Sequence, residues 1–206
     1  MSTLRHLFAA LAVASLLAGC GLPAGRPQPV TFHVLEVPPP AALAAPATPG
    51  PTLLLGDTEA QEILKGLNLV YSRSPGTLGQ YQYARWSEPP ARRLNLLLRQ
   101  RLEAGGLFRS VAELGTGVGG DIQLNTRLLD FHHEAVQAPG LARVALEAEL
   151  LDRRDGRLLA RQVFQAEAPA AGYDAAAAAR ALGQASGRLL DDLTQWLARV
   201  RMGDAR

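Results

Sequence analysis

The stretch DIQLNTRLLDFHHE, residues 121–134, decides the fold because apolar and polar side chains alternate along it. Successive side chains of a strand point to opposite faces, so one face of this segment is apolar and carries Ile122, Leu124, Thr126 and Leu128. Residues 141–151 alternate in the same way, and Asp155-Gly156 is a strong hairpin signal before residues 157–166. These segments predict a three-stranded antiparallel meander with one apolar face.

Two other segments have the apolar spacing of amphipathic helices. The first is predicted to be capped by Ser87 and to end at Gly105-Gly106. Its apolar stripe is Leu94, Leu97, Leu98 and Leu102, opposed by Arg92, Arg93, Arg99 and Arg101. The second is predicted from a cap at Asp174 to about Met202, with Asp191 and Asp192 on its solvated outer face. Its buried stripe is Ala181, Leu182, Ala185, Leu189, Leu193, Trp196 and Val200.

Shorter strands are predicted from composition at residues 30–37, 52–55, 67–72 and 80–86, and residues 107–114 form a less regular segment. Asp57 or Thr58 is expected to cap a brief helical turn. Together these elements predict an α+β fold in two layers. We expect a mainly antiparallel sheet of about six or seven strands, with the two long helices on one face.

The N-terminus is organised like a secretory signal peptide. Arg5 precedes an apolar run over residues 7–16, which is too short for a membrane span of roughly 20 residues. The sequence Leu17-Ala18-Gly19-Cys20 follows and resembles a bacterial lipobox. The mature protein is therefore expected to begin at Cys20, with covalent lipid on its sulfur and its amine. An ordinary signal peptide that has a cysteine near its cleavage site is the alternative.

This reading divides the chain into a signal peptide at 1–19, a lipidated tether at 20–29 and a single domain at 30–206. Residues 38–51, rich in proline and alanine, are expected to be an extended surface connector within the domain. Anchored lipid would hold the domain at the periplasmic face of the cell envelope.

Charge and cysteine content exclude several classes of function. The chain has a net charge of +2, which falls to +1 without residues 1–19 because they contain Arg5, so no nucleic-acid partner is expected. Cys20 is the only cysteine, which excludes an internal disulfide and a cysteine-based metal site. We expect no cofactor apart from the lipid on Cys20. The oligomeric state is left open, homo-oligomers included.

The motifs that suggest catalysis lack their structural context. Residues 115–120, GTGVGG, match a dinucleotide-binding fingerprint, but a strand is predicted after them where a helix is required. His132 and His133 are neighbours on a strand and should face opposite ways, although His33 could pair with one of them at a metal. Ser72, Ser74 and Ser87 lack a nucleophile-elbow pattern. The protein is therefore not expected to be an enzyme.

The aromatic residues have two interpretations. Trp86 and Trp196 are predicted to be core anchors rather than ligand platforms. In the strand over residues 80–86, Tyr81, Tyr83 and Arg85 would share one face and could form a partner-binding surface. The two tyrosines could equally pack under a helix.

Several of these features together resemble the ABC-type transport auxiliary lipoprotein family, which includes the paraquat-inducible lipoprotein subunit. The lipobox and early strand are followed by LVYSR at 69–73, YARWSEP at 83–89, GGLF at 105–108 and LDF at 129–131. A terminal helix follows the hairpin. The first strand departs from the family's Tyr-Tyr-x-Leu form, with Thr31-Phe32-His33-Val34-Leu35 in its place.

The resemblance implies a non-enzymatic partner of a lipid-transport system. Such systems pair an ABC transporter with mammalian-cell-entry proteins that bridge the periplasm, and the auxiliary lipoprotein docks on that bridge. Gly21 follows Cys20 where an aspartate is associated with retention in the inner membrane, which favours the outer membrane. A direct lipid or lipopolysaccharide carrier with an apolar cavity is the alternative. A secreted hydrolase would need a catalytic set that the sequence does not present.

Overall fold

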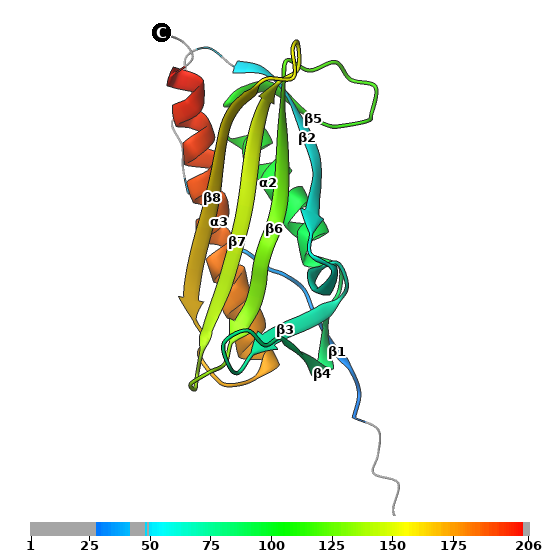
Figure 1. The fold of residues 1–206 in the computed structure, drawn as a ribbon, viewed down its shortest axis with the longest axis vertical. Helices are drawn as coiled ribbons and strands as arrows, with labels where there is room; N and C mark the ends of the chain where they lie inside the picture. Colours follow the sequence, from blue (N-terminus) through cyan, green and yellow to red (C-terminus); the bar gives the residue numbers. More distant parts are fainter. Residues whose placement is uncertain (1–27, 42–47, 49, 204–206) are drawn as a thin grey trace, which may run out of the picture.

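The computed structural model describes residues 28–41, 48 and 50–203 of the chain, with side chains up to residue 200 (Figure 1). The α+β fold with two long helices is confirmed. Within the described ranges there are eight strands rather than six or seven, together with a short 3-10 helix at Glu62–Leu64. The elements are β1 Thr31–His33, β2 Gly50–Ala60, β3 Asn68–Ser72, β4 Gly79–Trp86, α2 Pro90–Ala104, β5 Phe108–Glu113, β6 Ile122–Glu134, β7 Leu141–Asp152, β8 Leu158–Pro169 and α3 Ala175–Gly203.

The meander is confirmed: β6 pairs antiparallel with β7, and β7 pairs antiparallel with β8. The register between β6 and β7 shifts after Leu128, because Leu128 pairs with Leu146 while Asp130 pairs with Ala145. Leu129 is the extra residue of a β-bulge, which reverses the alternation of the strand. Leu128 and Phe131 consequently both lie in the core, although an uninterrupted strand would send them to opposite faces.

The rest of the sheet is mixed rather than mainly antiparallel. Beside the meander, only β3 and β4 pair antiparallel within the described residues. Strands β2 and β3 both run parallel to β6 along the same edge, β5 runs parallel to β2, and β1 runs parallel to β4. Antiparallel pairing dominates the described sheet through the long meander, as predicted, and the parallel pairs join segments that are distant in the sequence, because a parallel pair needs a long crossover.

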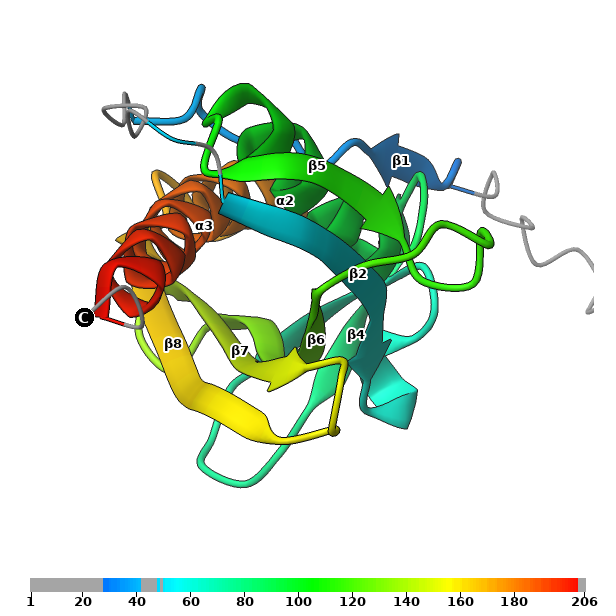
Figure 2. The same ribbon diagram turned by 90° about the horizontal axis from the view of Figure 1, so that it is seen from above.

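Both helices lie on the concave side of the sheet, which curls around them (Figure 2). Helix α3 contacts β7 and β8, and α2 contacts β2 and β5. The predicted apolar stripes are buried here, and Trp86 and Trp196 are confirmed as core residues at 1% and 6% exposure. The core side chains include Leu53, Leu94, Leu98, Leu102, Leu124, Leu146, Leu182, Leu189 and Leu193. None of the helices in the described ranges is long and apolar enough to span a membrane.

The two helix starts differ in how well the sequence predicted them. Asp174 caps α3 as expected: its Oδ1 accepts a hydrogen bond of 2.8 Å from the Ala177 N–H. Ser87 does not cap α2. The cap position is Pro89, which makes no side-chain cap bond, and the Ser87 N–H instead donates to the carbonyl of His33 at 2.9 Å. Ser87 continues the strand pairing because β1 lies beside it, which the local sequence does not indicate.

Strand β2 is longer than predicted, and the helical turn capped by Asp57 or Thr58 is wrong. Its register against β6 shifts between Leu55 and Thr58, so the strand passes through an irregularity and continues to Ala60. The Thr58 hydroxyl lies 2.7 Å from that of Thr126 on β6. A cross-strand partner thus takes the side chain that would have capped a helix.

The segment around residues 34–41 is also closer to the helices than predicted. Strand β1 covers only Thr31–His33 of the predicted 30–37, because the chain then crosses α3. A Cβ atom on Gly183 would collide with the Glu36 carbonyl, and one on Gly187 would lie 2.8 Å from the Pro38 Cδ. The segment can pass this close to α3 because Gly183 and Gly187, one helical turn apart, have no side chains. Of the expected connector 38–51, residues 42–47 and 49 lie outside the described part, and β2 already begins at Gly50.

Two charges predicted on solvated helix faces hold this crossing in place. Arg101 is only 5% exposed; its guanidinium donates to the Pro38 carbonyl at 2.8 Å and to the Asp191 carboxylate at 3.3 Å. Asp191 is thus an ion-pair partner between α2 and α3 rather than a free surface charge. The apolar pattern of one helix does not show this pair, because the partner of Arg101 lies on the other helix.

Candidate interaction surface

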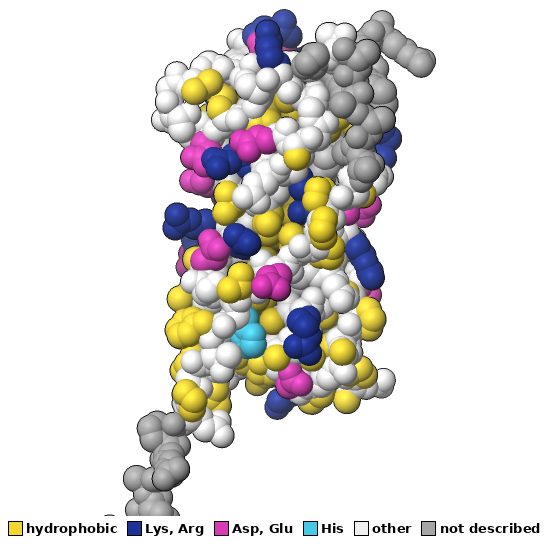
Figure 3. Space-filling view, turned by 180° about the vertical axis from the view of Figure 1, so that it is seen from behind, with side chains coloured by type: hydrophobic (Ala, Val, Ile, Leu, Met, Phe, Trp, Pro, Cys, Tyr) yellow, Lys and Arg dark blue, Asp and Glu magenta, His cyan; other side chains and the backbone are white. Residues whose placement is uncertain are grey.

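An exposed apolar face lies on β1, the strand at the edge of the sheet. Val30, Phe32 and Val34 are 45%, 60% and 52% exposed, whereas Leu35 is buried at 2%. Phe32 lies in β1 and Val30 and Val34 flank it; these three side chains point outward, whereas His33 is partly buried and Leu35 is buried. Figure 3 shows hydrophobic side chains gathered beside the point where the described chain begins. Exposed apolar surface of this kind marks interaction sites.

Strand β4 extends this face through two of the three residues predicted from its sequence. Phe32 pairs in register with Arg85, and Tyr83 is 41% exposed. We call Val30, Phe32, Val34, Tyr83 and Arg85 the β1–β4 patch. It joins aromatic, aliphatic and arginine side chains, the types enriched at protein interfaces.

Tyr81 does not share this face, which corrects the prediction that Tyr81, Tyr83 and Arg85 lie together. The register between β3 and β4 shifts, since Asn68 pairs with Arg85 but Val70 pairs with Gln80. This irregularity reverses the alternation within β4. Tyr81 consequently packs against the core, while Tyr83 stays outside.

The Tyr81 hydroxyl belongs to an internal aromatic cluster with His133. The His133 ring, fully buried, lies with Nε2 2.9 Å from the Pro139 carbonyl and Nδ1 2.8 Å from the Tyr81 hydroxyl. A carbonyl can only accept, so Nε2 donates, and in the neutral ring Nδ1 accepts from the phenol. Burial, with a contribution from nearby Tyr173, raises the pKa of Tyr81 to about 12. The cluster holds the phenol inside in its protonated form.

Arg85 stabilises the irregular part of β4. Its guanidinium donates to the carbonyls of Tyr81 and Ala84, at 2.5 and 2.8 Å. These bonds satisfy backbone oxygens close to the register shift. Arg85 therefore has a structural role in addition to its place in the β1–β4 patch, and the two roles must be separated in any mutational test.

The predicted histidine arrangement is confirmed in its geometry. His133 points into the core, whereas His132, the next residue, contacts the Asp130 carboxylate. His33 pairs in register with Trp86 on β4, away from this pair along the sheet. In the described ranges, no group of three or more His, Cys, Asp or Glu side chains is close enough to hold a metal ion.

The structure shows where two of the remaining sequence motifs lie. The glycine-rich residues 115–120 form the loop between β5 and β6, as expected when no helix follows the fingerprint. The Ser72 hydroxyl donates to the Ser74 carbonyl at 3.0 Å within the β3–β4 hairpin. Cys20 lies outside the described residues.

The lipid-carrier alternative requires an apolar cavity between the sheet and the helices. Leucine side chains and both tryptophans fill that layer, with the Phe164 and Trp196 rings 5.6 Å apart between centroids. A groove of about 180 Å³ beside the helices is lined by the charged side chains of Arg101 and Asp191. Its lining differs from the mostly apolar pockets that bind lipids.

Val30, Phe32 and Val34 were missed as candidates in the sequence, although a signal was present. The segment VTFHVLEV was interpreted only as a strand, yet three successive outward positions in it are apolar. A segment at the sheet edge that turns His33 and Leu35 inward does not need apolar residues on its other face. An apolar outer face therefore indicates contact with a partner outside the domain.

Comparison with solved structures finds proteins of the same fold. The structure is similar to protein XCC0632 from Xanthomonas campestris, with 25% identity and a TM-score of 0.74 over 85% of this chain and 99% of that one. It is also similar to an uncharacterized protein of 16% identity, with a TM-score of 0.64 over 82% and 99%. The hypothetical protein CT253 from Chlamydia trachomatis, 7% identical, shares the fold with a TM-score of 0.53 over 76% and 99%.

A search of curated proteins finds no match. The model of the family described as "ABC-type transport auxiliary lipoprotein component" matches residues 33–194, which cover the strands and helices from the end of β1 into α3. This chain therefore belongs to the ABC-type transport auxiliary lipoprotein family.

Proposed function

We propose that the protein is a lipid-anchored, non-enzymatic docking subunit of an ABC-type lipid-transport system. Its partner is the periplasmic part of a mammalian-cell-entry protein, which binds the β1–β4 patch. Family membership supports a role beside an ABC transporter. The observation that carries the docking role is the patch itself, in which Phe32 and Tyr83 are 60% and 41% exposed beside Arg85.

The anchor in this proposal is lipid on Cys20, the only cysteine of the chain. Two or more acyl chains anchor a protein stably, whereas one gives only marginal binding. Gly21 after the modified cysteine supports delivery to the outer membrane. The domain then faces the periplasm, where a bridging partner can reach it.

The anchor is tested with Cys20→Ala in the full-length chain. The variant should fold but leave the membrane fraction, because the lipid is its main attachment. Fractionation after a salt wash, with intact mass of the wild type to detect the lipid, measures this. A Cys20→Ala protein that stays in the washed pellet would rule out Cys20 as the main attachment.

Docking is tested by pull-down of the periplasmic mammalian-cell-entry domain with the detergent-solubilised mature protein. Tyr83→Ala combined with Phe32→Ala should weaken binding about thirtyfold or more, because truncating a hot-spot residue costs about 2 kcal/mol or above. Val163→Ala on β8, where the valine is 44% exposed, is the matched control and should bind like the wild type. Tyr83→Ala with Arg85→Ala is the second variant, with its melting temperature recorded because Arg85 bonds the backbone.

The outcomes separate the docking role from its alternative. Wild-type protein that fails to bind but co-purifies with stoichiometric lipid would replace docking with lipid carriage. Equal binding by the Phe32, Tyr83 double variant and by Val163→Ala would remove the β1–β4 patch from the interface.

A further inference from the structure

Three loops of the domain meet at one end, where the described chain also begins (Figure 1). They are residues 73–78 between β3 and β4, residues 135–140 between β6 and β7, and residues 170–174 between β8 and α3; we call them the loop end. Ala135 joins them, because its N–H donates to the Ser72 carbonyl at 2.6 Å and its carbonyl accepts from the Tyr173 hydroxyl at 2.6 Å. The loops are thus held in a fixed relation to one another.

Each loop exposes a large apolar or aromatic side chain. Leu78, Val136 and Tyr173 are 48%, 49% and 46% exposed. The only charged residues in the three loops are Arg73 and Asp174. Both are engaged within the domain: the Arg73 guanidinium lies 4.8 Å from the centroid of the Tyr71 ring, and Asp174 caps α3. Little charge would have to be desolvated if the loop end entered an apolar medium.

The length of the N-terminal chain sets how far this end can lie from a bilayer. Cys20 precedes Gln28, the first described residue, by eight positions. Eight residues span at most about 29 Å when fully extended. A lipid on Cys20 therefore keeps the end of the domain at which Gln28 lies within about that distance of the membrane surface.

We propose that Leu78, Val136 and Tyr173 form a second membrane contact that inserts shallowly into the headgroup region beside the lipid anchor. This inference rests on the proposed anchoring through Cys20. Tyrosine is enriched at membrane interfaces, and the aliphatic side chains gain free energy by leaving water. Because the loops carry almost no charge, the contact is hydrophobic and insensitive to salt. The contact limits the orientations that the domain can take at the membrane.

Site-specific labelling tests the contact on the full-length chain. A lipidated Cys20 has no free thiol, so an added cysteine is the only labelling site for an environment-sensitive fluorophore. The probes are Val136→Cys and Leu78→Cys. The matched control is Val118→Cys in the β5–β6 loop, where the valine has nearly the same exposure, 50% against 49% for Val136. Proteins are reconstituted into vesicles of phosphatidylethanolamine and phosphatidylglycerol at three to one, with and without nitroxide lipid.

We expect labels at 78 and 136 to gain fluorescence and to be quenched by shallow nitroxide lipid, and the label at 118 to do neither. Leu78→Asp in the Val136→Cys protein should abolish the quenching while the intact mass still shows the lipid. High salt should leave the quenching unchanged. The parent chain without added cysteine reports on the anchor, since labelling of Cys20 itself would refute the anchor and not the loop contact.

Two results would overturn the inference while the lipid on Cys20 remains present. Labels at 136 and 118 that behave alike in vesicles would show that the loop end does not contact the bilayer. Labels at 78 and 136 that respond only when the mammalian-cell-entry domain is added would make the loop end part of the protein interface.

Discussion

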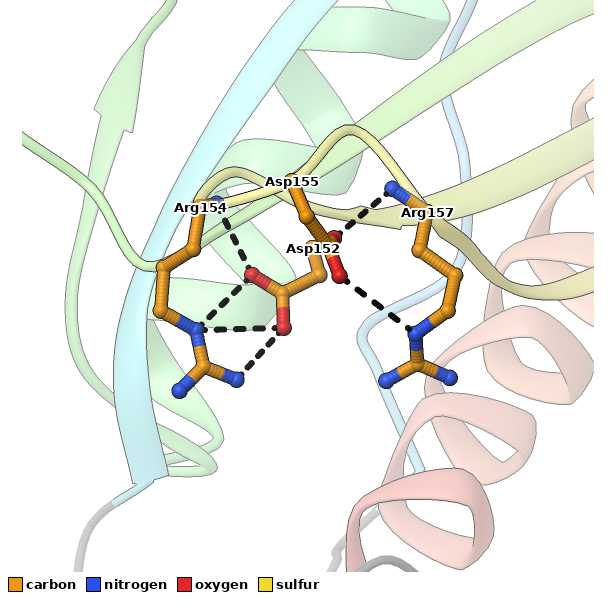
Figure 4. A network of polar contacts seen from close by, with 4 residues as sticks. All are labelled: Asp152, Arg154, Asp155 and Arg157. Carbon is orange, nitrogen blue, oxygen red and sulfur yellow. Dashed lines mark hydrogen bonds and ion pairs between the residues drawn. The ribbon is translucent and has the colours of Figure 1, made fainter.

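The two ends of the domain differ in how many charged residues their loops contain. The loop end and the adjacent strands are packed through aromatic rings, with Tyr81 stacked 6.3 Å from His133 between centroids. The hairpin between β7 and β8 at the other end has the sequence DRRDGR at 152–157 and is held by ion pairs (Figure 4). The Asp152 carboxylate accepts from the Arg154 backbone N–H at 2.9 Å and from its guanidinium at 3.0 and 3.2 Å.

This difference in charge makes the loop end, and not the β7–β8 hairpin, suited to contact with a bilayer. An end with five charged residues among the six of its hairpin cannot approach a bilayer without desolvating them, whereas the loop end can. Truncating buried aromatic groups should affect the whole fold, because they contact several strands. The arginines of these ion pairs are exposed, although Asp152 itself is only 4% exposed. Ion pairs that are open to solvent contribute little, so the charged hairpin should tolerate change.

The largest effect is expected for Trp86→Ala, which removes the ring beneath the β1–β4 patch. Trp86 is 1% exposed, and its ring centroid lies 5.6 Å from that of Phe131. Loss of this packing should lower the free energy of unfolding by about 3–5 kcal/mol. Urea unfolding followed by circular dichroism measures it, and Tyr83→Ala, exposed on the same strand, should change it by less than about 0.5 kcal/mol. An unchanged melting temperature in Trp86→Ala would assign the ring to docking.

A smaller loss of stability is expected for Gly183→Ala, which tests how tightly the segment after β1 packs against α3. The added methyl group meets the carbonyl oxygen of Glu36, so either the segment or the helix must move. Such overpacking typically costs about 1–3 kcal/mol. Gly119→Ala is the control because no atom lies within 4 Å of its Cβ position. Equal stability of the two variants in urea would mean that the crossing is not tightly packed.

Tyr81→Phe should lower the free energy of unfolding moderately, and it should also change how that free energy varies with pH above 10. Losing the hydrogen bond to His133 should cost about 1 kcal/mol at neutral pH. The phenol ionises near pH 10 in the unfolded chain but at about 12 in the fold, so the unfolded state loses its proton first. The free energy of unfolding of the wild type should therefore fall as the pH rises from 10 to 12. The variant should lack this part of the decline, whereas Tyr83→Phe should keep it.

The smallest effect is expected for Asp152→Asn at the charged end: the variant should be slightly less stable than the wild type at neutral pH, and the difference should disappear in acid. Hydrogen bonds from the Arg154 side chain and backbone lower the pKa of Asp152 to about 2. Between pH 4 and 2 the unfolded chain takes up this proton first, so the wild type loses stability as the pH falls through that range. The variant should show a shallower acid decline in urea unfolding. Asp155→Asn in the same hairpin is the control and should leave the slope nearly unchanged.

Elements defined by local pattern could be predicted from the sequence. The meander β6–β7–β8 has alternation and an Asp-Gly turn, and α3 has a capping aspartate and a long apolar stripe, all within short stretches of chain. Strand β2 could not be predicted in full. Its pairing with β6 at Thr58 and Thr126 joins segments far apart in sequence, and it overrode the capping signal at Asp57 and Thr58.

The candidate surface shows the same division. The local pattern was enough to predict a strand that carries Tyr81, Tyr83 and Arg85, with an apolar strand before it. The pairing with β3 was needed to show that Tyr83 is exposed while Tyr81 is partly buried and contacts His133. The physical reason is the register shift against β3, an irregularity that depends on the partner strand. The burial of Arg101 was likewise decided by Asp191 on the other helix and by the chain that crosses between them.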